Sequence, residues 1–349
     1  MARLYHATPL PLLTELMDLS RYLMGLAEAP PAVASWDDLV ELARIWHVAG
    51  KLWHSGDRTG RLSDLPPAVA AAFHAEFERN RARNLRVADK LCAIASGLNA
   101  VGVTPVLLKG SAYIVDPVSG DAATRYMHDI DFSILELDRL ARTDRHLLDM
   151  GLAPVDTRAR RRRPEATYYH YPALVDPATG IEVELHKQPF RGISDPVLDL
   201  YRRGLVEATV GAATVMLPSR EFRFLHTVIH AQEAGKSIFH AYFNPRYLIE
   251  GLEYLQAMTE AERRRVTDGR IGYGVYLGSW LVLLDRFLRP PFAIGFEPGP
   301  VHGLQYRRIV RRGGFPSHTT TLGQLAWRLR KATNPDVNRR IGRILETQA

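Results

Sequence analysis

The sequence predicts an α+β fold, in which a small mixed-sheet core is flanked by an N-terminal and a C-terminal helical region. Two observations favour this fold. Apolar residues recur at helical spacing before about residue 100 and again after Pro218. Between these regions, short apolar runs separated by glycine and proline are typical of strands. We therefore expect a helical region over residues 1–100, a core over residues 101–217, and a helical region with a basic tail over residues 218–349.

The N-terminal region should contain helices over residues 9 to about 55, where leucines fall at helical spacing. A further helix should begin near Pro67, because proline suits the first helical turn. It should continue to about Asn99, and Gly102 marks its end.

The core segment alternates strand and helix signals. In chain order, we expect a strand over 105–108, a helix over 110–115, a strand over 130–135, a helix over 137–150, and strands over 168–175 and 181–185. The loop over residues 176–180, Asp-Pro-Ala-Thr-Gly, suits a hairpin between the last two strands.

The C-terminal region should form helices over residues 219–234, 245–258 and 272–288. His226 and His230 lie one turn apart on the first of these helices, where they could serve a metal, the nucleotide or the helix packing. The last 45 or so residues are rich in arginine and broken by proline and glycine. A second basic run, Arg160 to Arg163, suits either a solvated loop or an anionic acceptor such as tRNA.

The formal net charge of +7 and the pI near 9.5 favour anionic partners such as nucleotides or nucleic acids. The sequence has no uninterrupted run of 18 or more apolar residues and no secretory-signal pattern. Its one cysteine, Cys92, permits no intrachain disulfide. We therefore expect a cytoplasmic protein with no membrane partner.

The segment Lys109-Gly110-Ser111 joins the first predicted core strand to a helix. Glycine lets the backbone approach a phosphate closely, and the amides of a new helix turn favour an anion. Lys109 adds a charge and Ser111 a hydroxyl donor. The segment therefore suits phosphate binding, although a plain turn would look similar.

Two carboxylates, Asp129 and Asp131, stand at the start of the next apolar strand. Residues i and i+2 of a strand face the same side, so the two acids should point into one space. Paired anions are costly without a cation, and carboxylate oxygens suit Mg²⁺. The pair predicts a metal site.

A third carboxylate is expected from the second strand of the hairpin. Glu184 lies on an apolar strand, where it could complete the metal site or attract the proton of an attacking hydroxyl. Glu182 shares its face and is the competing candidate. His186 shares this face too and could be either functional or structural.

These residues resemble the polymerase-beta-like nucleotidyltransferase superfamily, and within it the poorly characterised bacterial nucleotidyltransferase family proteins. The resemblance rests on Leu107-Leu108-Lys109-Gly110, Arg125, Asp129-Ile130-Asp131 and Glu184-Leu185-His186. A looser match to the superfamily's helical C-terminal extension covers Phe224-Leu225-His226 through His230 and Arg246-Tyr247-Leu248-Ile249-Glu250. The sequence departs from the pattern at Lys187, where an aromatic residue is usual, and at Glu250, where aspartate is common. Both departures bear on the substrate.

The resemblance implies an enzyme that moves an NMP from an NTP, ATP included, to an acceptor hydroxyl and releases pyrophosphate. Asp129, Asp131 and Glu184 would be the catalytic residues and would hold Mg²⁺, with Mn²⁺ as the other candidate ion. Lys109, Gly110, Ser111 and Arg125 would bind the nucleotide, Arg125 bracing either a phosphate or one of the aspartates. We expect the acceptor to be a small molecule or a peptide.

Two other functions stay open: a toxin-type enzyme that modifies tRNA, and a catalytically inactive module that binds nucleotides or nucleic acid. A kinase is disfavoured, because the residue five positions after Asp129 is Ile134 rather than asparagine and no glycine-rich loop precedes it. The sequence leaves the acceptor, the base and the oligomeric state undetermined.

Overall fold

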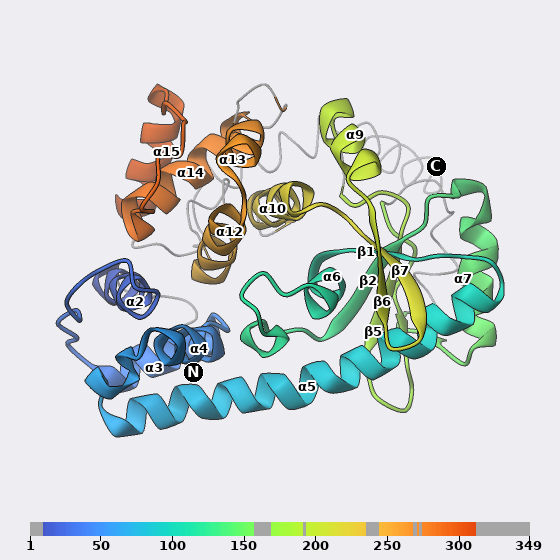
Figure 1. Ribbon diagram of the computed structural model, residues 1–349, viewed down its shortest axis with the longest axis horizontal. Helices are drawn as coiled ribbons and strands as arrows, with labels where there is room; N and C mark the ends of the chain where they lie inside the picture. Colours follow the sequence, from blue (N-terminus) through green and yellow to red (C-terminus); the bar gives the residue numbers. More distant parts are fainter. Residues whose placement is uncertain are drawn as a thin grey trace, which may run out of the picture.

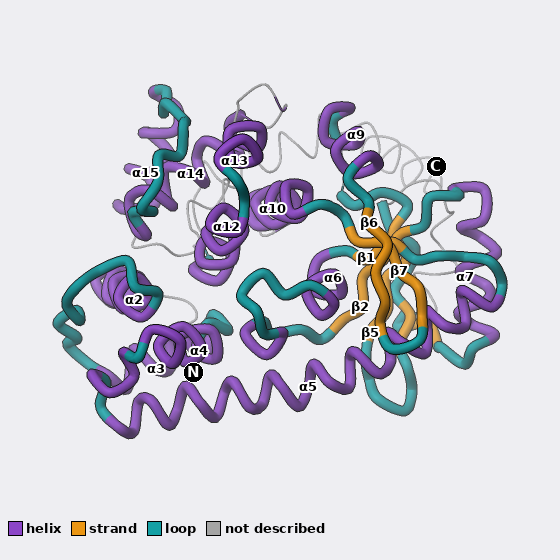
Figure 2. Tube along the Cα trace, viewed as in Figure 1, coloured by secondary structure: helices purple, strands orange, loops and turns teal. Residues whose placement is uncertain are grey.

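The structure is a computed structural model that describes residues 10–156, 169–190, 193–234, 244–267, 271 and 274–311. It confirms the predicted α+β class. The strands gather at one end of the molecule and most of the helices at the other, as Figures 1 and 2 show.

The N-terminal region is helical, as predicted. Its elements are α2 (Leu10–Leu23), α3 (Trp36–Ile45), α4 (Ala49–Thr59), the 3-10 turn η1 (Arg61–Asp64) and α5 (Pro67–Ala100). Helix α5 is 34 residues long and begins at Pro67, and Gly102 follows its end with a positive φ of 73°. It extends from the helical end of the molecule to the sheet (Figure 1), so one rigid element underlies both parts.

Seven strands of the described residues form one mixed sheet in the order β3-β4-β5-β2-β1-β7-β6. They are β1 (Val106–Leu107), β2 (Asp129–Ser133), β3 (Ala153–Pro154), β4 (Leu174–Val175), β5 (Glu182–His186), β6 (Val206–Val210) and β7 (Ala213–Leu217). Strand β1 is antiparallel to β2 and parallel to β7, while β2 and β5 are parallel. The two central strands β2 and β5 therefore end at the same edge of the sheet.

The helical segments of the core are α6 (Lys109–Val115), η2 (Ala122–Thr124), η3 (Leu137–Arg139), α7 (Leu140–Asp149) and α9 (Asp195–Arg203). The hairpin expected around residues 176–180 is confirmed, because β4 pairs antiparallel with β5. Its first strand is shorter than predicted, because β4 covers only Leu174–Val175 whereas the expected strand covered residues 168–175. Residue 168 lies outside the described residues.

The hairpin β6–β7 and helix α9 were not among the predicted elements. Strand β6 is an edge strand whose residues are mostly exposed, so its sequence Val-Glu-Ala-Thr-Val lacks a clear apolar run. The turn between β6 and β7 contains Gly211 at φ +57°, a conformation that glycine adopts readily.

The C-terminal region contains α10 (Arg220–Ile229), the π-helical turn η4 (His230–Ala234), α12 (Pro245–Ala257), α13 (Glu260–Thr267), α14 (Gly274–Leu288) and α15 (Pro300–Arg311). The three predicted helices are therefore confirmed. Ser219 caps α10 and Asn244 caps α12, each through a hydrogen bond from a backbone N–H of the first turn to its side-chain oxygen.

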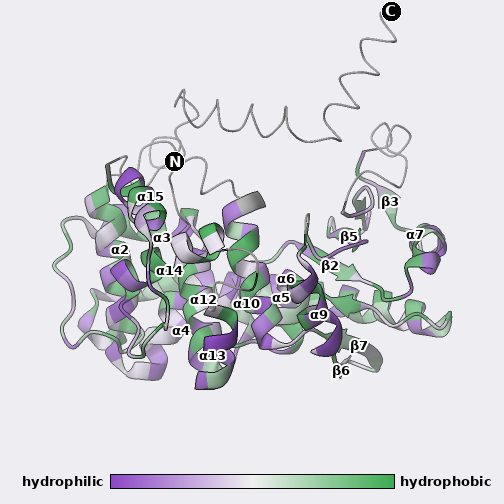
Figure 3. Ribbon diagram, turned by 90° about the horizontal axis from the view of Figure 1, so that it is seen from above, coloured by the Kyte–Doolittle hydropathy of each residue, from purple (hydrophilic) through white to green (hydrophobic). Residues whose placement is uncertain are grey.

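Two hydrophobic cores hold these parts together. The larger combines α2–α5 with α10, α12 and α14, and it includes Val106 and Leu108 from the core segment. The smaller lies between the sheet, the second half of α5 and α7. Hydrophobic residues mark α14 in Figure 3, and this helix packs deep in the larger core. The two helical regions thus pack against each other as well as against the core.

The basic run over residues 160–163 and the chain beyond residue 311 lie outside the described residues. None of the described helices combines the length and the apolar character that a membrane span needs.

Candidate active site

The turn between β1 and α6 carries Lys109 toward the middle of the sheet. Lys109 has a φ of +46°, a left-handed conformation that is uncommon for residues other than glycine. The N–H of the preceding Leu108 donates a hydrogen bond to the carbonyl oxygen of Asp131, at 3.0 Å. Such strained backbone is held by its surroundings and is concentrated at functional sites.

The predicted acids lie on adjacent parallel strands. In the register of β2 and β5, Asp129 is opposite Glu182 and Asp131 is opposite Glu184. Because alternate residues of a strand share a face, the four carboxylates project from the same side of the sheet. The local pattern of each strand thus becomes one acidic surface through the strand pairing.

Asp131 is buried and contacts Lys109 and His186. Its Oδ1 lies 2.6 Å from Lys109 Nζ and 2.8 Å from His186 Nε2, and its side chain is 1% exposed. Burial alone would raise the pKa of Asp131, but the Lys109 ammonium and the hydrogen bond from His186 hold it well below its usual value. Asp131 is therefore ionised at neutral pH.

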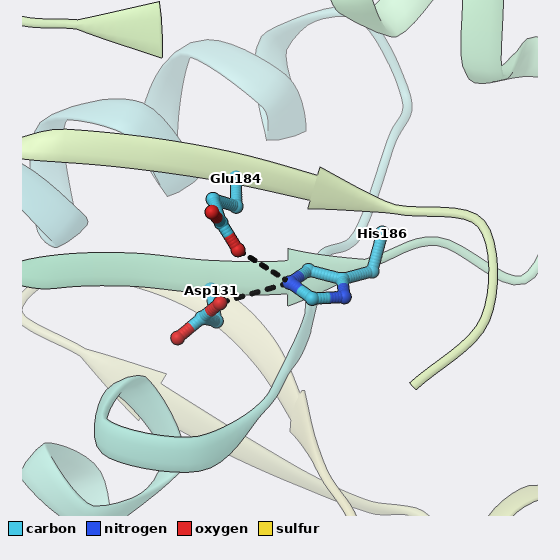
Figure 4. Close-up of side chains that lie close together, drawn as sticks. All are labelled: Asp131, Glu184 and His186. Atoms are coloured by element: carbon cyan, nitrogen blue, oxygen red, sulfur yellow. Dashed lines mark hydrogen bonds and ion pairs between the residues drawn. The ribbon is translucent and has the colours of Figure 1, made fainter. Parts of the chain in front are cut away.

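Glu184 and Asp131 share one imidazole nitrogen. Figure 4 shows His186 between the two carboxylates, with its Nε2 3.3 Å from Glu184 Oε2. Lys109 Nζ lies 3.7 Å from the same oxygen. Burial opposes ionisation of Glu184, but the hydrogen bond with His186 lowers its pKa below the ordinary value. Burial likewise opposes charging of His186, yet its bonds to the two acids raise its pKa.

Asp129 occupies the more open end of this acidic surface. Its carboxylate lies 4.0 Å from His128 Nε2, and its side chain is 29% exposed. Burial and the nearby charge of Asp131 raise the pKa of Asp129. A carboxylate in this position gains most from an added cation.

The donor set fits a divalent metal ion. Asp131, Glu184 and His186 each offer a ligand atom, and these atoms lie within 4.8 Å of one another. Asp131 Oδ2 is buried and has no hydrogen-bond partner among the described residues, so it has a lone pair to offer. Carboxylate oxygens are the ligands that Mg²⁺ and Mn²⁺ prefer. Neither Asp129 nor Glu182 is part of this cluster.

Ser111 and Gly110 support the site in different ways. The Ser111 hydroxyl is fully buried and accepts a hydrogen bond from the Asp131 N–H, at 2.8 Å. Gly110 lines the neighbouring cavity, and a Cβ there would come within 2.8 Å of Met127 Sδ. The roles of both residues in nucleotide binding stay predictions.

A cavity of about 220 Å³ opens beside the acids. Its core wall contains Lys109, Gly110, Asp129 and Asp131. Its other walls come from helices α10 and α12 and from the segments around His47 and Tyr126. All three regions of the chain therefore contribute to one cavity.

Arg125 reaches this cavity but is engaged in an ion pair. Its guanidinium lies 2.7 Å from Glu250 Oε1, and Glu250 is fully buried on α12. Thr227 on α10 donates a hydrogen bond to the same oxygen, at 3.4 Å. Arg125 thus contacts Glu250 rather than either aspartate, while its predicted contact with phosphate stays a prediction.

Several residues of the cavity wall were not among the predicted site residues. His47 stacks on Tyr126 with ring centroids 4.0 Å apart and an angle of 10° between the planes. Arg246 and Tyr247 come from the first turn of α12. These contacts join segments far apart in the chain, so no local spacing could have indicated them.

His226 of α10 and His230, the first residue of η4, also line the cavity. His226 and His230 are neutral, because burial and the charge of Lys109 lower the pKa of His226 far below its usual value and that of His230 to about 3. Their ring centroids are 6.5 Å apart. Neither belongs to the metal-ligating cluster found among the described residues.

Comparison with known proteins supports the same chemistry. The model of a protein family described as "Uncharacterised nucleotidyltransferase" matches residues 33–267, about two thirds of the chain. The match covers the complete acidic cluster and helices α10 and α12. No curated protein matches the chain.

Proposed function

This chain belongs to the family of uncharacterised nucleotidyltransferases, and we propose that it transfers an NMP from an NTP to an acceptor hydroxyl. The acceptor oxygen forms a bond to the α-phosphorus, the bond to the β-phosphate breaks, and pyrophosphate leaves. The observation that carries this proposal is the convergence of Asp129, Asp131 and Glu184 on one face of two adjacent strands beside a cavity.

Asp129, Asp131 and Glu184 would hold Mg²⁺ or Mn²⁺. A divalent cation at this site supplies charge neutralisation for the triphosphate and for the charge that develops during displacement. The unpartnered Asp131 Oδ2 and the raised pKa of Asp129, which burial and Asp131 cause, both support cation binding.

The protein's own residues position the reactants. Lys109 lies beside Asp131 and Glu184, from where its ammonium can contact a phosphate oxygen at the same site. Glu184 stays ionised, so its free oxygen can accept a hydrogen bond from the acceptor hydroxyl and orient it. His186 fixes the directions of both carboxylates through its Nε2.

We propose that the acceptor is a small molecule or a peptide. The cavity is small and lies between the core and both helical regions, which suits a compact or narrow acceptor better than a folded RNA. A tRNA acceptor would have to use basic segments such as residues 160–163. The size of the labelled product distinguishes a tRNA acceptor from a peptide or a small molecule.

A matched pair of variants tests the role of the third acid. Glu184→Gln should keep NTP binding within about twofold and reduce transfer by roughly a hundredfold or more, a typical loss when a transition-state interaction is removed. Glu182→Gln, on the same strand and face, should leave transfer near the wild-type rate. The measurement is transfer of an α-³²P label alongside NTP binding by calorimetry.

Three results would each contradict a part of the proposed function. Equal activity in Glu184→Gln and wild type, with loss in Glu182→Gln, would move the role to Glu182. Metal-dependent NTP binding that survives in Asp131→Asn would contradict the assignment of the metal site to Asp131. Nucleotide binding with no transfer under any condition would favour an inactive binding module.

A further inference from the structure

We propose that Arg246, together with His226 and His230, forms the subsite that holds the β- and γ-phosphates of the NTP. This inference rests on the proposed function and names the part of the cavity that takes the leaving group. The three residues line the cavity from α10, η4 and α12.

The charges around the cavity single out Arg246. Lys109 is paired with Asp131, Arg125 with Glu250, and Arg223 with Asp116. Within the described part of the chain, Arg246 is the cavity lysine or arginine with no carboxylate at ion-pair distance. A guanidinium without a counter-ion at the wall of a cavity is suited to an anionic ligand.

Two polar nitrogen atoms in this subsite lack partners. The Nε of Arg246 and the Nε2 of His226 are buried and make no hydrogen bond within the described structure. His226 as a whole is 3% exposed and lines the cavity. A buried polar atom without a partner costs roughly 1–3 kcal/mol, so such atoms at a cavity wall indicate a ligand that satisfies them.

The subsite extends outward from the reaction centre. His226 and His230 line the same cavity as Lys109 and Asp131, and their ring centroids are 6.5 Å apart. His230 follows on the same helix side, its ring 5.8 Å from that of Tyr247, and the guanidinium of Arg246 lies 4.9 Å from the Tyr247 ring centre. A phosphate chain that begins at the acids can therefore follow this wall toward Arg246.

The phosphate chain explains this wall better than a nucleoside does. The α-phosphate must lie at the acids, where the chemistry takes place, and the two further phosphates carry most of the ligand's remaining charge. A guanidinium binds phosphate oxygens in a fork, and a neutral imidazole donates one hydrogen bond. A base or ribose would leave the Arg246 charge unmatched.

Binding measurements without turnover test the subsite. Calorimetry would compare the NTP that binds most tightly of the four, its monophosphate and inorganic pyrophosphate, each with wild type and Arg246→Gln. We expect Arg246→Gln to weaken binding of the NTP and pyrophosphate at least tenfold and to leave monophosphate binding within twofold. The affinities of Arg246→Lys for the NTP and for pyrophosphate should lie between those of wild type and Arg246→Gln. Arg264→Gln, on exposed α13, should match wild type.

His226→Gln provides a second variant if Arg246→Gln does not fold, and it should show the same selective loss for pyrophosphate. An equal loss of NTP and monophosphate affinity would overturn the proposal in favour of a nucleoside contact. Unchanged NTP and pyrophosphate affinity with a raised KM for the acceptor would overturn it in favour of an acceptor subsite. Because pyrophosphate binding needs no transfer, absence of transfer alone would count against the proposed function and not against this subsite.

Discussion

At the scale of single residues, the position of Asp131 depends on groups around it. Its side chain is held by Lys109 and His186, its N–H by the Ser111 hydroxyl, and its carbonyl by the Leu108 N–H. The sequence predicts Ser111 as a phosphate donor, which stays a prediction, and the structure shows that its oxygen accepts a hydrogen bond from a buried backbone N–H. Only the packing of α6 against β2 reveals that contact.

Ser111→Ala should therefore destabilise the folded protein. The variant leaves the buried N–H of Asp131 without an acceptor, which costs about 1–3 kcal/mol in free energy of unfolding. Chemical denaturation measures this loss, with Ser63→Ala as control, because Ser63 is exposed and its replacement should change stability by less than about 0.5 kcal/mol. Equal stability of the two variants would show that the contact contributes nothing.

At the scale of elements, most of the helices and central strands could be predicted from the sequence. Helix α5 has a proline at its start and a glycine after its end, and β2 and β5 alternate polar and apolar residues beside turn residues. The edge hairpin β6–β7 was missed because an exposed edge strand has little apolar pattern to detect. The signals that predict elements come from burial, so the least buried elements escape them.

Buried ion pairs connect these elements. Lys51 on α4 pairs with Glu253 on α12, and both side chains are almost fully buried, at 1% and 9% exposed. Lys51 Nζ also lies 3.4 Å from the Tyr113 hydroxyl on α6. Lys51 therefore connects the N-terminal helical region to the C-terminal helical region and to the core.

Lys51→Met should destabilise the protein strongly, because it leaves the Glu253 carboxylate buried without a counter-charge. Removal of one partner from a buried pair typically costs about 3–5 kcal/mol. The double variant Lys51→Met/Glu253→Leu should recover a large part of that loss, since apolar replacement of both partners is often tolerated. Thermal and chemical unfolding would measure both, with Arg264→Gln, which breaks an exposed pair, as control. No difference between single and double variants would contradict this account.

At the scale of the whole molecule, the site depends on all three regions. The acids and Lys109 could be predicted from the sequence, because each stands in a local strand or turn pattern. His47, Tyr126 and Arg246 could not, because the cavity brings them together from separate regions. The predicted boundaries at residues 100 and 217 stay predictions, and the shared hydrophobic core indicates how closely the regions are packed.

The central claim is that the acidic cluster catalyses transfer of the α-phosphoryl group with its nucleoside. Incubation with NTP labelled at either the α- or the γ-phosphate, with Mg²⁺ and an extract of the source cells, tests it most directly. The account predicts that α-label enters a product, that γ-label is released as pyrophosphate, and that Asp131→Asn abolishes both. Transfer of γ-label to the product, or α-label transfer that persists in Asp131→Asn, would contradict it.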